Sequence, residues 1–269
     1  MGFWRFESHP TPPTPATLNA PTLPDPVAWA GSSFNFDPDP RQAEVLRCTS
    51  SNVILCCTRQ WGKSTITAIK ALHYAWFHPG SLILVAAPTL RQSGEWLAKT
   101  TALLRLLHVK PRGDGHNENS LLLPNGSRLV GLPGVADNIR GFSAVSLLLV
   151  DEAAYVPDPL FHALYPMLAV SAGALWVMST PNGQSGFFYD AWHATASEWT
   201  RFRIPATECP RISAAFLERQ RLAFGDQVFR REYLCEFLAS DSQILSRELI
   251  DEAFVDNPAF NQGRPLWRQ

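Results

Sequence analysis

Short apolar segments alternate with amphipathic segments through the middle of this chain. The apolar segments are bounded by glycine, proline or polar residues, and they predict strands buried on both faces at 53–56, 81–87, 145–150 and 174–178. Apolar residues recur with helical spacing in the segments 66–76, 92–107 and 160–168. Alternating strands and helices favour an α/β fold, with a doubly wound, mostly parallel sheet and helices on both faces.

One pair of segments departs from this alternation. Residues 121–123 and 127–130 are separated by the sequence Pro124-Asn125-Gly126. Asn-Gly is typical of the tight turn that joins two antiparallel strands. We therefore predict a β-hairpin in this part of the chain.

The beginning of the chain differs in composition from its middle. Residues 1–35 are rich in proline, which predicts a flexible N-terminal arm. Aromatic side chains in this arm are available to dock on another surface: Phe3, Trp4, Phe6 and Trp29. The globular core is predicted to begin at residue 36 and to end at residue 204.

Arginine residues crowd the chain from position 201 onward. Segments 213–224 and 226–233 predict two short helices, which we place in a small helical subdomain at 205–240. Two interpretations stay open. The helices are either a solvated cap with ordinary charge pairs, or a lid that packs over a functional site or contacts a neighbour or DNA. The polar residues 241–269 predict a linker.

A loop with the composition of a phosphate-binding site follows the first predicted strand. It has the sequence Cys57-Thr58-Arg59-Gln60-Trp61-Gly62-Lys63-Ser64-Thr65 and opens the helix at 66–76. Backbone N–H groups at a helix N-terminus attract phosphate, and Gly62 lets a ligand approach the backbone closely. Lys63 is placed to reach the β- and γ-phosphates, and the Ser64 hydroxyl is a ligand for Mg²⁺. Cys57 stands where the usual pattern has glycine, so an exposed turn with one lysine is the alternative.

Two carboxylates follow the strand predicted at 145–150. Asp151 and Glu152 lie at its carboxyl end, which is the edge of an open α/β sheet where ligands bind. We predict that Asp151 and Ser64 share one Mg²⁺ at the tips of neighbouring strands. Glu152 is predicted to orient and deprotonate an attacking water. The simpler alternative is a buried strand that runs into a solvated acidic turn.

The bulk composition limits the classes of function that remain. The 269 residues are 46% hydrophobic and 17% charged, which is typical of a globular protein with a full core. A formal net charge of −1 argues against tight electrostatic binding of duplex DNA by an isolated chain, so a DNA contact would need a local patch or an oligomer. Five cysteines lack metal-ligand spacing, and we find neither a bilayer-spanning segment nor a secretory signal. These features predict a soluble intracellular protein without a membrane partner.

Taken in order, these motifs resemble the ATPase half of the large terminase subunit, the motor that packages DNA into the procapsids of tailed bacteriophages. The resemblance covers roughly residues 36–240. It rests on the loop at 58–64, Asp137-Asn138-Ile139-Arg140-Gly141, the acidic strand end, Ser179-Thr180-Pro181, and Arg231-Glu232-Tyr233 with Glu236-Phe237. The family's variant loop often has Arg-Gln before the last glycine and lacks the first glycine, which accounts for Cys57.

The resemblance implies a P-loop NTPase fold, with ATP and Mg²⁺ as ligands. It implies that ATP hydrolysis drives translocation of double-stranded DNA into a procapsid. The implied partners are the portal protein, the procapsid, the small terminase subunit and further copies of the chain in a homo-oligomeric ring. The implied location is the cytoplasm of an infected or lysogenic bacterial host.

The resemblance also implies roles for single residues, with an ordinary structural contact as the alternative in each case. Gln42 sits where the family places a glutamine that hydrogen-bonds adenine, and Thr180 sits where phosphate release is sensed. Arg59 would sense the γ-phosphate, because a guanidinium fork suits a phosphate group. Arg140 matches an arginine that reaches a neighbour's ATP site in some relatives. The implied catalytic set is Lys63, Glu152, Arg59 and Arg140, and the nucleotide-binding set is Gln42, Thr58, Arg59, Gln60, Trp61, Gly62, Lys63, Ser64, Thr65 and Thr180.

One feature of the family is not found in this sequence. Large terminases carry a second, RNase H-like nuclease domain, in which a strand leads into an aspartate for two-metal chemistry. Asp241, Asp251 and Asp256 have no apolar strand before them, so we assign no nuclease activity to these residues. The chain could be truncated, split or partial. Two other functions stay open: another P-loop DNA translocase or helicase-like ATPase, and a truncated prophage fragment that binds without turnover.

Overall fold

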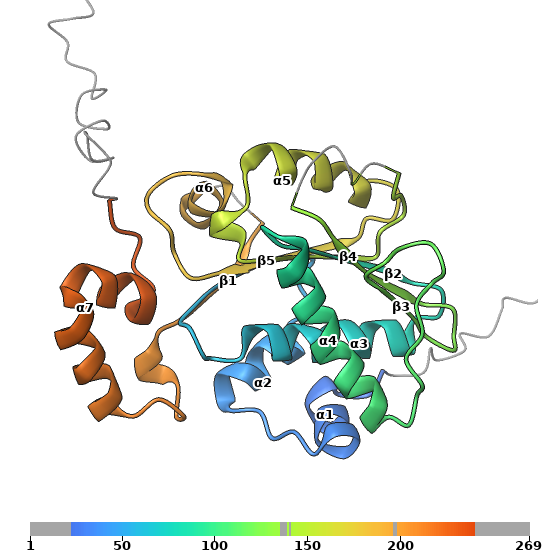
Figure 1. Cartoon of the computed structure of the whole chain (residues 1–269), viewed down its shortest axis with the longest axis horizontal. Helices are drawn as coiled ribbons and strands as arrows, with labels where there is room; N and C mark the ends of the chain where they lie inside the picture. Colours follow the sequence, from blue (N-terminus) through green and yellow to red (C-terminus); the bar gives the residue numbers. More distant parts are fainter. Residues whose placement is uncertain (1–22, 135–138, 140, 196–197, 240–269) are drawn as a thin grey trace, which may run out of the picture.

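The centre of the molecule is a seven-stranded sheet with the order β3-β4-β2-β5-β6-β1-β7 (Figure 1). The computed structural model describes residues 23–134, 139, 141–195 and 198–239. The strands are β1 Asn52–Cys57, β2 Leu82–Ala86, β3 Ser120–Leu122, β4 Arg128–Leu132, β5 Leu147–Asp151, β6 Ala174–Ser179 and β7 Thr200–Ile204. All pairs are parallel except β3 with β4, which form the predicted antiparallel hairpin. The predicted doubly wound, mostly parallel α/β fold is confirmed.

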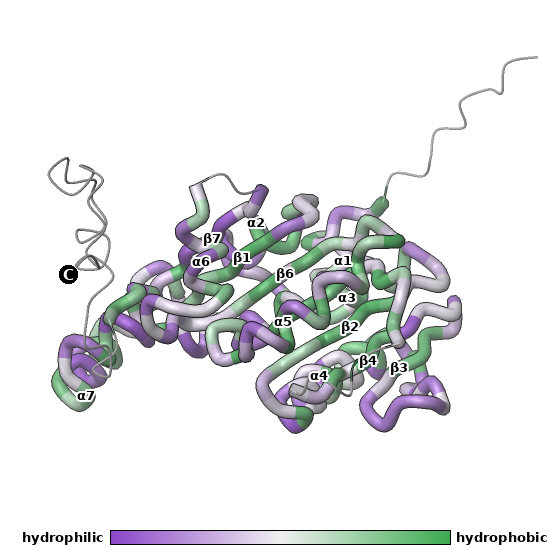
Figure 2. Tube along the Cα trace, turned by 90° about the horizontal axis from the view of Figure 1, so that it is seen from above, coloured by the Kyte–Doolittle hydropathy of each residue, from purple (hydrophilic) through white to green (hydrophobic). Residues whose placement is uncertain are grey.

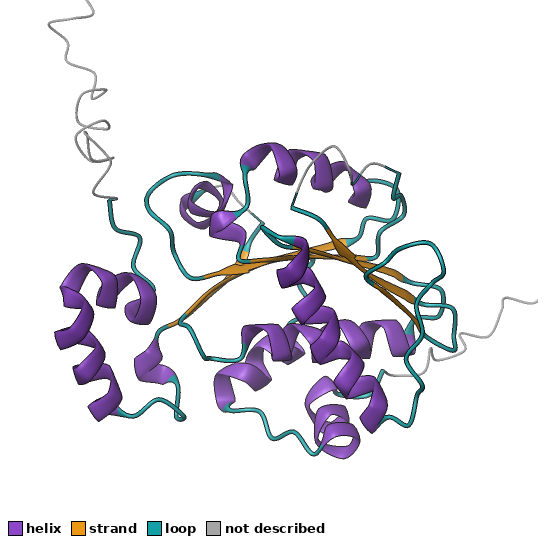
Figure 3. Cartoon of the chain, in the orientation of Figure 1, coloured by secondary structure: helices purple, strands orange, loops and turns teal. Residues whose placement is uncertain are grey.

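Helices cover both faces of this sheet (Figure 3). One face carries α1 Pro26–Phe34, α2 Pro40–Arg47, α3 Lys63–Phe77 and α4 Leu90–Leu106, and the other carries α5 Asp158–Leu164 and α6 Phe187–His193. Short 3₁₀ helices lie at Ala153–Tyr155 (η2), Tyr165–Leu168 (η3) and Ala206–Glu208 (η4). The last helix, α7 Ala214–Leu234, stands apart beyond one end of the sheet. None of the helices in the described ranges is both long enough and apolar enough to cross a membrane.

The buried residues of the strands alternate between two apolar layers. In β1, Val53 and Leu55 pack in the layer with α1, α3 and α4, whereas Ile54 and Cys56 pack in the layer with α5 and α6. Figure 2 shows β1, β6 and β2 as mostly hydrophobic strands through the middle of the molecule. A strand covered on both faces needs a nearly continuous apolar run, which is the feature that predicts it from sequence.

The predicted boundary of the N-terminal arm at residue 35 is wrong, because α1 belongs to the core. The Asp25 side chain caps this helix, and Pro26 occupies its first turn, where a missing N–H costs nothing. Trp29 is 9% exposed and packs edge-to-face on Phe77 of α3, with ring centroids 6.0 Å apart. The burial of this aromatic side chain outweighs the proline-rich composition. Residues 1–22 lie outside the described part of the chain.

The prediction that both halves of the site lie on neighbouring strands is also wrong. β6 lies between β1 and β5 and pairs in parallel with each of them. The order of strands is set by long-range pairing, which the spacing of motifs along the chain does not reveal. One consequence is that β6 brings its own carboxyl end, Ser179, between the phosphate loop and the acidic pair.

The predicted pair of C-terminal helices is present in α7. Gly225 lies inside this helix with φ 77° and ψ 167°, a conformation that is not helical and that divides α7 in two. Glycine is the residue that adopts a positive φ without strain from a Cβ atom. The division matches the predicted break between 213–224 and 226–233. Residues 240–269 lie outside the described part, so the predicted linker at 241–269 stays a prediction.

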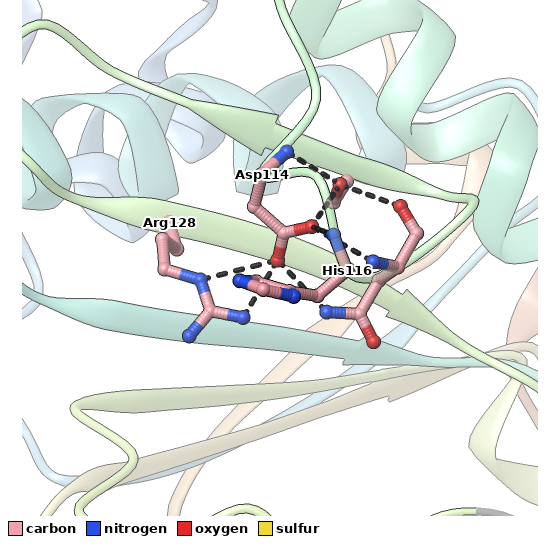
Figure 4. A network of polar contacts seen from close by, with 5 residues as sticks. Asp114, His116 and Arg128 are labelled. Atoms are coloured by element: carbon pink, nitrogen blue, oxygen red, sulfur yellow. Dashed lines mark hydrogen bonds and ion pairs between the residues drawn. The ribbon is translucent and has the colours of Figure 1, made fainter.

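A buried carboxylate fastens the loop that precedes β3 to strand β4 (Figure 4). The Asp114 carboxylate accepts hydrogen bonds from the backbone N–H groups of His116 and Asn117, at 2.9 and 2.8 Å. Arg128 Nη2 of β4 lies 2.6 Å from Asp114 Oδ2, and the Asp114 side chain is 2% exposed. Burial alone would raise the pKa of Asp114, but these donors together lower it well below its usual range. The network stabilises the β3–β4 edge of the sheet.

Candidate active site

The loop between β1 and α3 has the backbone of a phosphate cradle. Gly62 precedes α3 with φ 102°, and no side chain caps the first turn of that helix. A Cβ atom at position 62 would lie 3.2 Å from Gln42 Nε2, so both the conformation and the space favour glycine. An uncapped helix N-terminus leaves its dipole and N–H groups facing the loop, where they favour an anion.

The carbonyl of Trp61 fixes this loop to the rest of the protein. It accepts hydrogen bonds from Gln42 Nε2 at 2.9 Å and from Arg211 Nη2 at 2.6 Å. Gln42 Oε1 in turn accepts from the backbone N–H of Asp39, at 3.1 Å. Gln42 is 3% exposed and the Trp61 side chain is fully buried. Gln42 thus contacts the loop, and its role toward adenine stays a prediction.

Helix α7 contacts the loop from the opposite side of the chain. Thr58 Oγ1 donates to the backbone carbonyl of Glu232, at 3.1 Å. Arg59 Nε donates to Glu232 Oε2 at 2.6 Å, across 173 residues of sequence. The Arg59 side chain is 62% exposed, whereas that of Glu232 is 9% exposed and also binds Arg231. The helical subdomain therefore packs against the phosphate loop.

The predicted metal-binding pair lies at one edge of the sheet. Ser64 Oγ is 3.4 Å from Asp151 Oδ2, so the two oxygens are close enough to bind one ion between them. Asp151 Oδ1 accepts the backbone N–H of Glu152, at 3.0 Å, which holds the carboxylate in place. A hydroxyl and a carboxylate are oxygen donors of the kind that Mg²⁺ prefers, and Mg²⁺ usually takes few protein ligands. These two residues therefore fit a bound Mg²⁺.

The second carboxylate, Glu152, forms an ion pair with the loop lysine. Lys63 Nζ lies 2.7 Å from Glu152 Oε1, and both side chains are largely shielded from solvent. Ser179 Oγ, at the end of β6, donates to Glu152 Oε2 at 3.4 Å. Glu152 has φ 51°, a left-handed conformation that a non-glycine residue seldom adopts. Such strain is common where a side chain must be aimed at a ligand.

Burial and charge shift the pKa values of this cluster. Burial raises the pKa of Asp151, with a further contribution from Glu152, although Lys63 opposes the shift. Burial alone would lower the pKa of Lys63, but the nearby acidic groups Cys57, Glu152 and Asp151 outweigh it and raise that pKa. Lys63 is therefore a fixed cation at neutral pH, held among groups that a triphosphate would displace or join.

A cavity of about 420 Å³ opens in front of these groups. Its lining includes Gln92, from the first turn of α4, and Tyr155 of η2, beside residues of the loop and Glu152. Sequence reasoning did not single out Gln92 or Tyr155. A signal for Gln92 was present, because it follows β2 at the same carboxyl edge as the other strands.

The remaining predicted residues are distributed around this cavity. Lys63, Arg59 and Gln60 line it, and Thr65 lies in the first turn of α3. Thr180 directly follows β6 and is 1% exposed. Arg140 lies outside the described residues, so its role stays a prediction.

A family profile described as "Terminase large subunit, T4likevirus-type, N-terminal" matches residues 54–252. The chain belongs to this family. Two curated relatives agree with the match: the large terminase subunit of Thermus virus P23-45, 26% identical over 250 residues, and the probable large terminase subunit of Enterobacteria phage P7, 24% identical over 260 residues. These alignments cover 79% and 84% of this chain. They cover 51% of each relative, so the chain spans about half the length of the curated terminases it matches.

Solved terminase structures share the fold of this terminase domain. The large terminase ATPase domain of Thermus phage P74-26 superposes with a TM-score of 0.70 at 23% identity, covering 80% of this chain and 99% of that one. The large terminase of another thermophilic bacteriophage, in complex with ADP, gives a TM-score of 0.64 at 15% identity, covering 74% of this chain and 53% of that one. The fold is that of the P-loop NTPase domain of terminases.

Proposed function

We propose that this chain hydrolyses ATP and that hydrolysis drives double-stranded DNA into a viral procapsid. The observation that carries the proposal is the pairing of two contacts at one sheet edge: Ser64 Oγ with Asp151 Oδ2 at 3.4 Å, and Lys63 Nζ with Glu152 Oε1 at 2.7 Å. Family membership supports it, as do the printed titles of similar structures, which name an ATPase domain and complexes with ADP and ATP-gamma-S.

The residues divide the work of phosphoryl transfer between them. The loop and the N-terminus of α3 hold the phosphates, and Lys63 moves from Glu152 to the γ-phosphate as ATP binds. Ser64 and Asp151 would hold Mg²⁺, which bridges phosphate oxygens and offsets the charge that develops on them. Glu152, released from Lys63, accepts a proton from the water that attacks the γ-phosphorus. The bond to the bridging oxygen breaks, and ADP and phosphate leave.

The proposal extends to the parts of the motor that surround this domain. Arg140 would complete the site of a neighbouring copy in a ring, and Thr180 would report phosphate release from its position after β6. The portal protein, the small terminase subunit and the procapsid would be the partners, in the cytoplasm of a bacterial host. ATP hydrolysis is the only reaction that we assign to these residues.

Hydrolysis by the purified chain tests the proposal directly. We expect phosphate release from ATP that requires Mg²⁺ and that rises when duplex DNA and a portal-type partner are added. EDTA should abolish it, because Ser64 and Asp151 act through the ion. Hydrolysis that persists in EDTA would argue against the assigned site. A chain that binds ATP without any turnover would favour the non-catalytic fragment, and turnover stimulated by DNA but not by a portal would favour another type of translocase.

The contact between Arg59 and Glu232 predicts a measurable effect on ATP binding. Arg59 must leave Glu232 to reach the γ-phosphate, so the 2.6 Å ion pair opposes ATP binding. Glu232→Gln keeps the size of the side chain but removes its charge. We expect the KM for ATP to fall about two- to fivefold, a modest change because Arg59 is largely exposed and its pair is screened by solvent.

A matched control is available on the same subdomain. Glu236→Gln breaks a similar pair, between Glu236 Oε2 and Arg230 Nη2 at 2.7 Å, that does not involve the loop. It should leave the KM for ATP unchanged. An equal change in both variants, measured by steady-state phosphate release, would mean that Arg59 does not exchange Glu232 for phosphate.

A further inference from the structure

A second cavity opens beside the phosphate loop, on the side of the C-terminal helices. Its volume is about 520 Å³, and it shares Arg59 and Gln60 with the first cavity. Its remaining lining comes from the segment before α7 and from α7 itself: Arg211, Ile212, Ser213, Phe216, Arg219 and Tyr233. In Figure 1 this helix lies beyond the end of β1 at which the loop begins. Nothing in the proposed reaction uses this space.

The reacting end of the nucleotide determines which way the rest of it extends. Glu152 and Lys63 line only the first cavity, so the γ-phosphate belongs there under the proposed function. Arg59 and Gln60 are common to both cavities. A triphosphate that follows the loop past these two residues therefore carries its ribose and base into the second cavity.

The walls of the second cavity suit the flat face of a base. Phe216 is 36% exposed although it is apolar, and its ring lies 6.2 Å from that of Tyr233 at an interplanar angle of 74°. The Tyr233 hydroxyl already donates to Gln220 Oε1, at 2.9 Å. Arg211 is likewise engaged, with the Trp61 carbonyl and with Asp39. The cavity thus offers apolar and aromatic surface, on which a base of any sequence can stack.

The groups that could read the edge of a base do not separate adenine from guanine. Gln42 is 3% exposed, does not line the cavity, and uses both ends of its amide on Asp39 and Trp61. Arg219 does line it, but a guanidinium only donates hydrogen bonds, and N7 of both purines accepts them.

We propose that this cavity is the subsite for ribose and base, that it holds purines by stacking on Phe216 and Tyr233, and that it binds ATP and GTP with similar affinity. Gln42 is then a positioning residue for the loop and reads no base. The inference rests on the proposed function for the direction of the nucleotide.

Calorimetric titration with three probes tests the subsite: Mg·ATP, Mg·GTP and magnesium tripolyphosphate. We expect the Kd values for ATP and GTP to agree within about tenfold in the unaltered chain. Phe216→Ala should weaken both nucleotides by about tenfold, the effect of losing one stacked ring, and leave tripolyphosphate unchanged. Leu222→Ala, a 76% exposed position on the same helix, is the control and should change none of them. Thermal unfolding of each variant checks that it is folded.

Gln42→Ala separates the two roles of that residue. A loop-positioning glutamine predicts equal weakening of ATP, GTP and tripolyphosphate, whereas a base-reading glutamine predicts weakening of ATP alone. Selective loss of ATP, a preference for ATP over GTP beyond about a hundredfold, or a Phe216→Ala variant that behaves like Leu222→Ala would each overturn the subsite.

The binding data also distinguish this inference from the proposed function. If the expected binding pattern appears but ATP is not hydrolysed, the proposed function fails and the subsite stands. If ATP is hydrolysed but the binding pattern does not appear, the subsite alone fails.

Discussion

Replacing Glu152 with glutamine should lower the kcat for ATP hydrolysis about a thousandfold, within the range of 10²–10⁴ typical of a general base. The glutamine side chain keeps the size of Glu152 and its contact with Ser179, which is 3.4 Å away. It cannot accept the proton of the attacking water at neutral pH. Single-turnover phosphate release with saturating Mg·ATP measures the chemical step directly.

ATP binding should survive in this variant. Lys63 loses the anionic partner that lies 2.7 Å away, so it is freer to bind phosphate. We therefore expect a Kd for ATP equal to or lower than that of the unaltered chain, which separates lost chemistry from lost structure. Glu95→Gln, at an exposed position on α4, is the control and should keep full activity. A kcat for Glu152→Gln within about threefold of the unaltered value would remove Glu152 from the mechanism.

The buried strands could be predicted from sequence because each needs a distinctive composition. β1, β2, β5 and β6 are covered on both faces, and each appears as an apolar run between turn residues. β7 was missed, although Thr200-Arg201-Phe202-Arg203-Ile204 alternates polar and apolar residues as a half-buried edge strand does. Its arginines drew attention to charge instead of period.

Two further elements show why composition can mislead. α1 begins at Pro26 in a proline-rich segment, yet proline at the first turn of a helix is favourable. α6 is only seven residues long, too short for a convincing helical period. Its burial comes from tertiary contacts such as the stacking of Phe187 on Phe161, with ring centroids 4.0 Å apart. No pattern within either segment specifies its partner.

The site could be predicted only as far as its residues are local to a motif. The loop and the acidic strand end each carry their chemistry in adjacent residues, so the pairing of Ser64 with Asp151 was expected and lies at 3.4 Å. The supports of the loop come from distant parts of the chain. Arg211 reaches Trp61 across 150 residues and Glu232 reaches Arg59 across 173. One sequence without its fold cannot pair such residues, because nothing local requires either contact.

Replacing Asp151 with asparagine should abolish Mg²⁺-dependent hydrolysis while making the nucleotide-free protein more stable. Activity falls because a neutral amide is a poor ligand for a hard cation, and we expect a loss of at least about a hundredfold. Stability rises because burial and Glu152 together raise the pKa of Asp151, which shows that its ionised form is unfavourable in the fold. Functional carboxylates often reduce stability in this way.

The sign of the pH dependence follows from proton binding. Between the ordinary aspartate pKa and the raised one, the folded chain binds more protons at Asp151 than the unfolded chain does. The folded chain therefore loses stability as pH rises through that window. We expect Asp151→Asn to raise the Tm by about 2–4 °C at neutral pH, the equivalent of about 1 kcal/mol for a domain of this size. The gain should shrink as pH falls toward the ordinary aspartate pKa, where the native carboxyl is also neutral.

Asp114→Asn provides a control of opposite sign on another buried aspartate. Hydrogen bonds from His116, Asn117 and Arg128 lower the pKa of Asp114, so its charge stabilises the fold above the ordinary aspartate pKa. That contribution is lost as pH falls through the lowered pKa. At neutral pH the substitution should lower the Tm by about 4–8 °C, from about 2 kcal/mol of charge-assisted hydrogen bonding, and leave ATP hydrolysis intact below the Tm. If Asp151→Asn instead lowered the Tm as Asp114→Asn does, Asp151 would be a structural carboxylate and its assignment to Mg²⁺ would lose its electrostatic support.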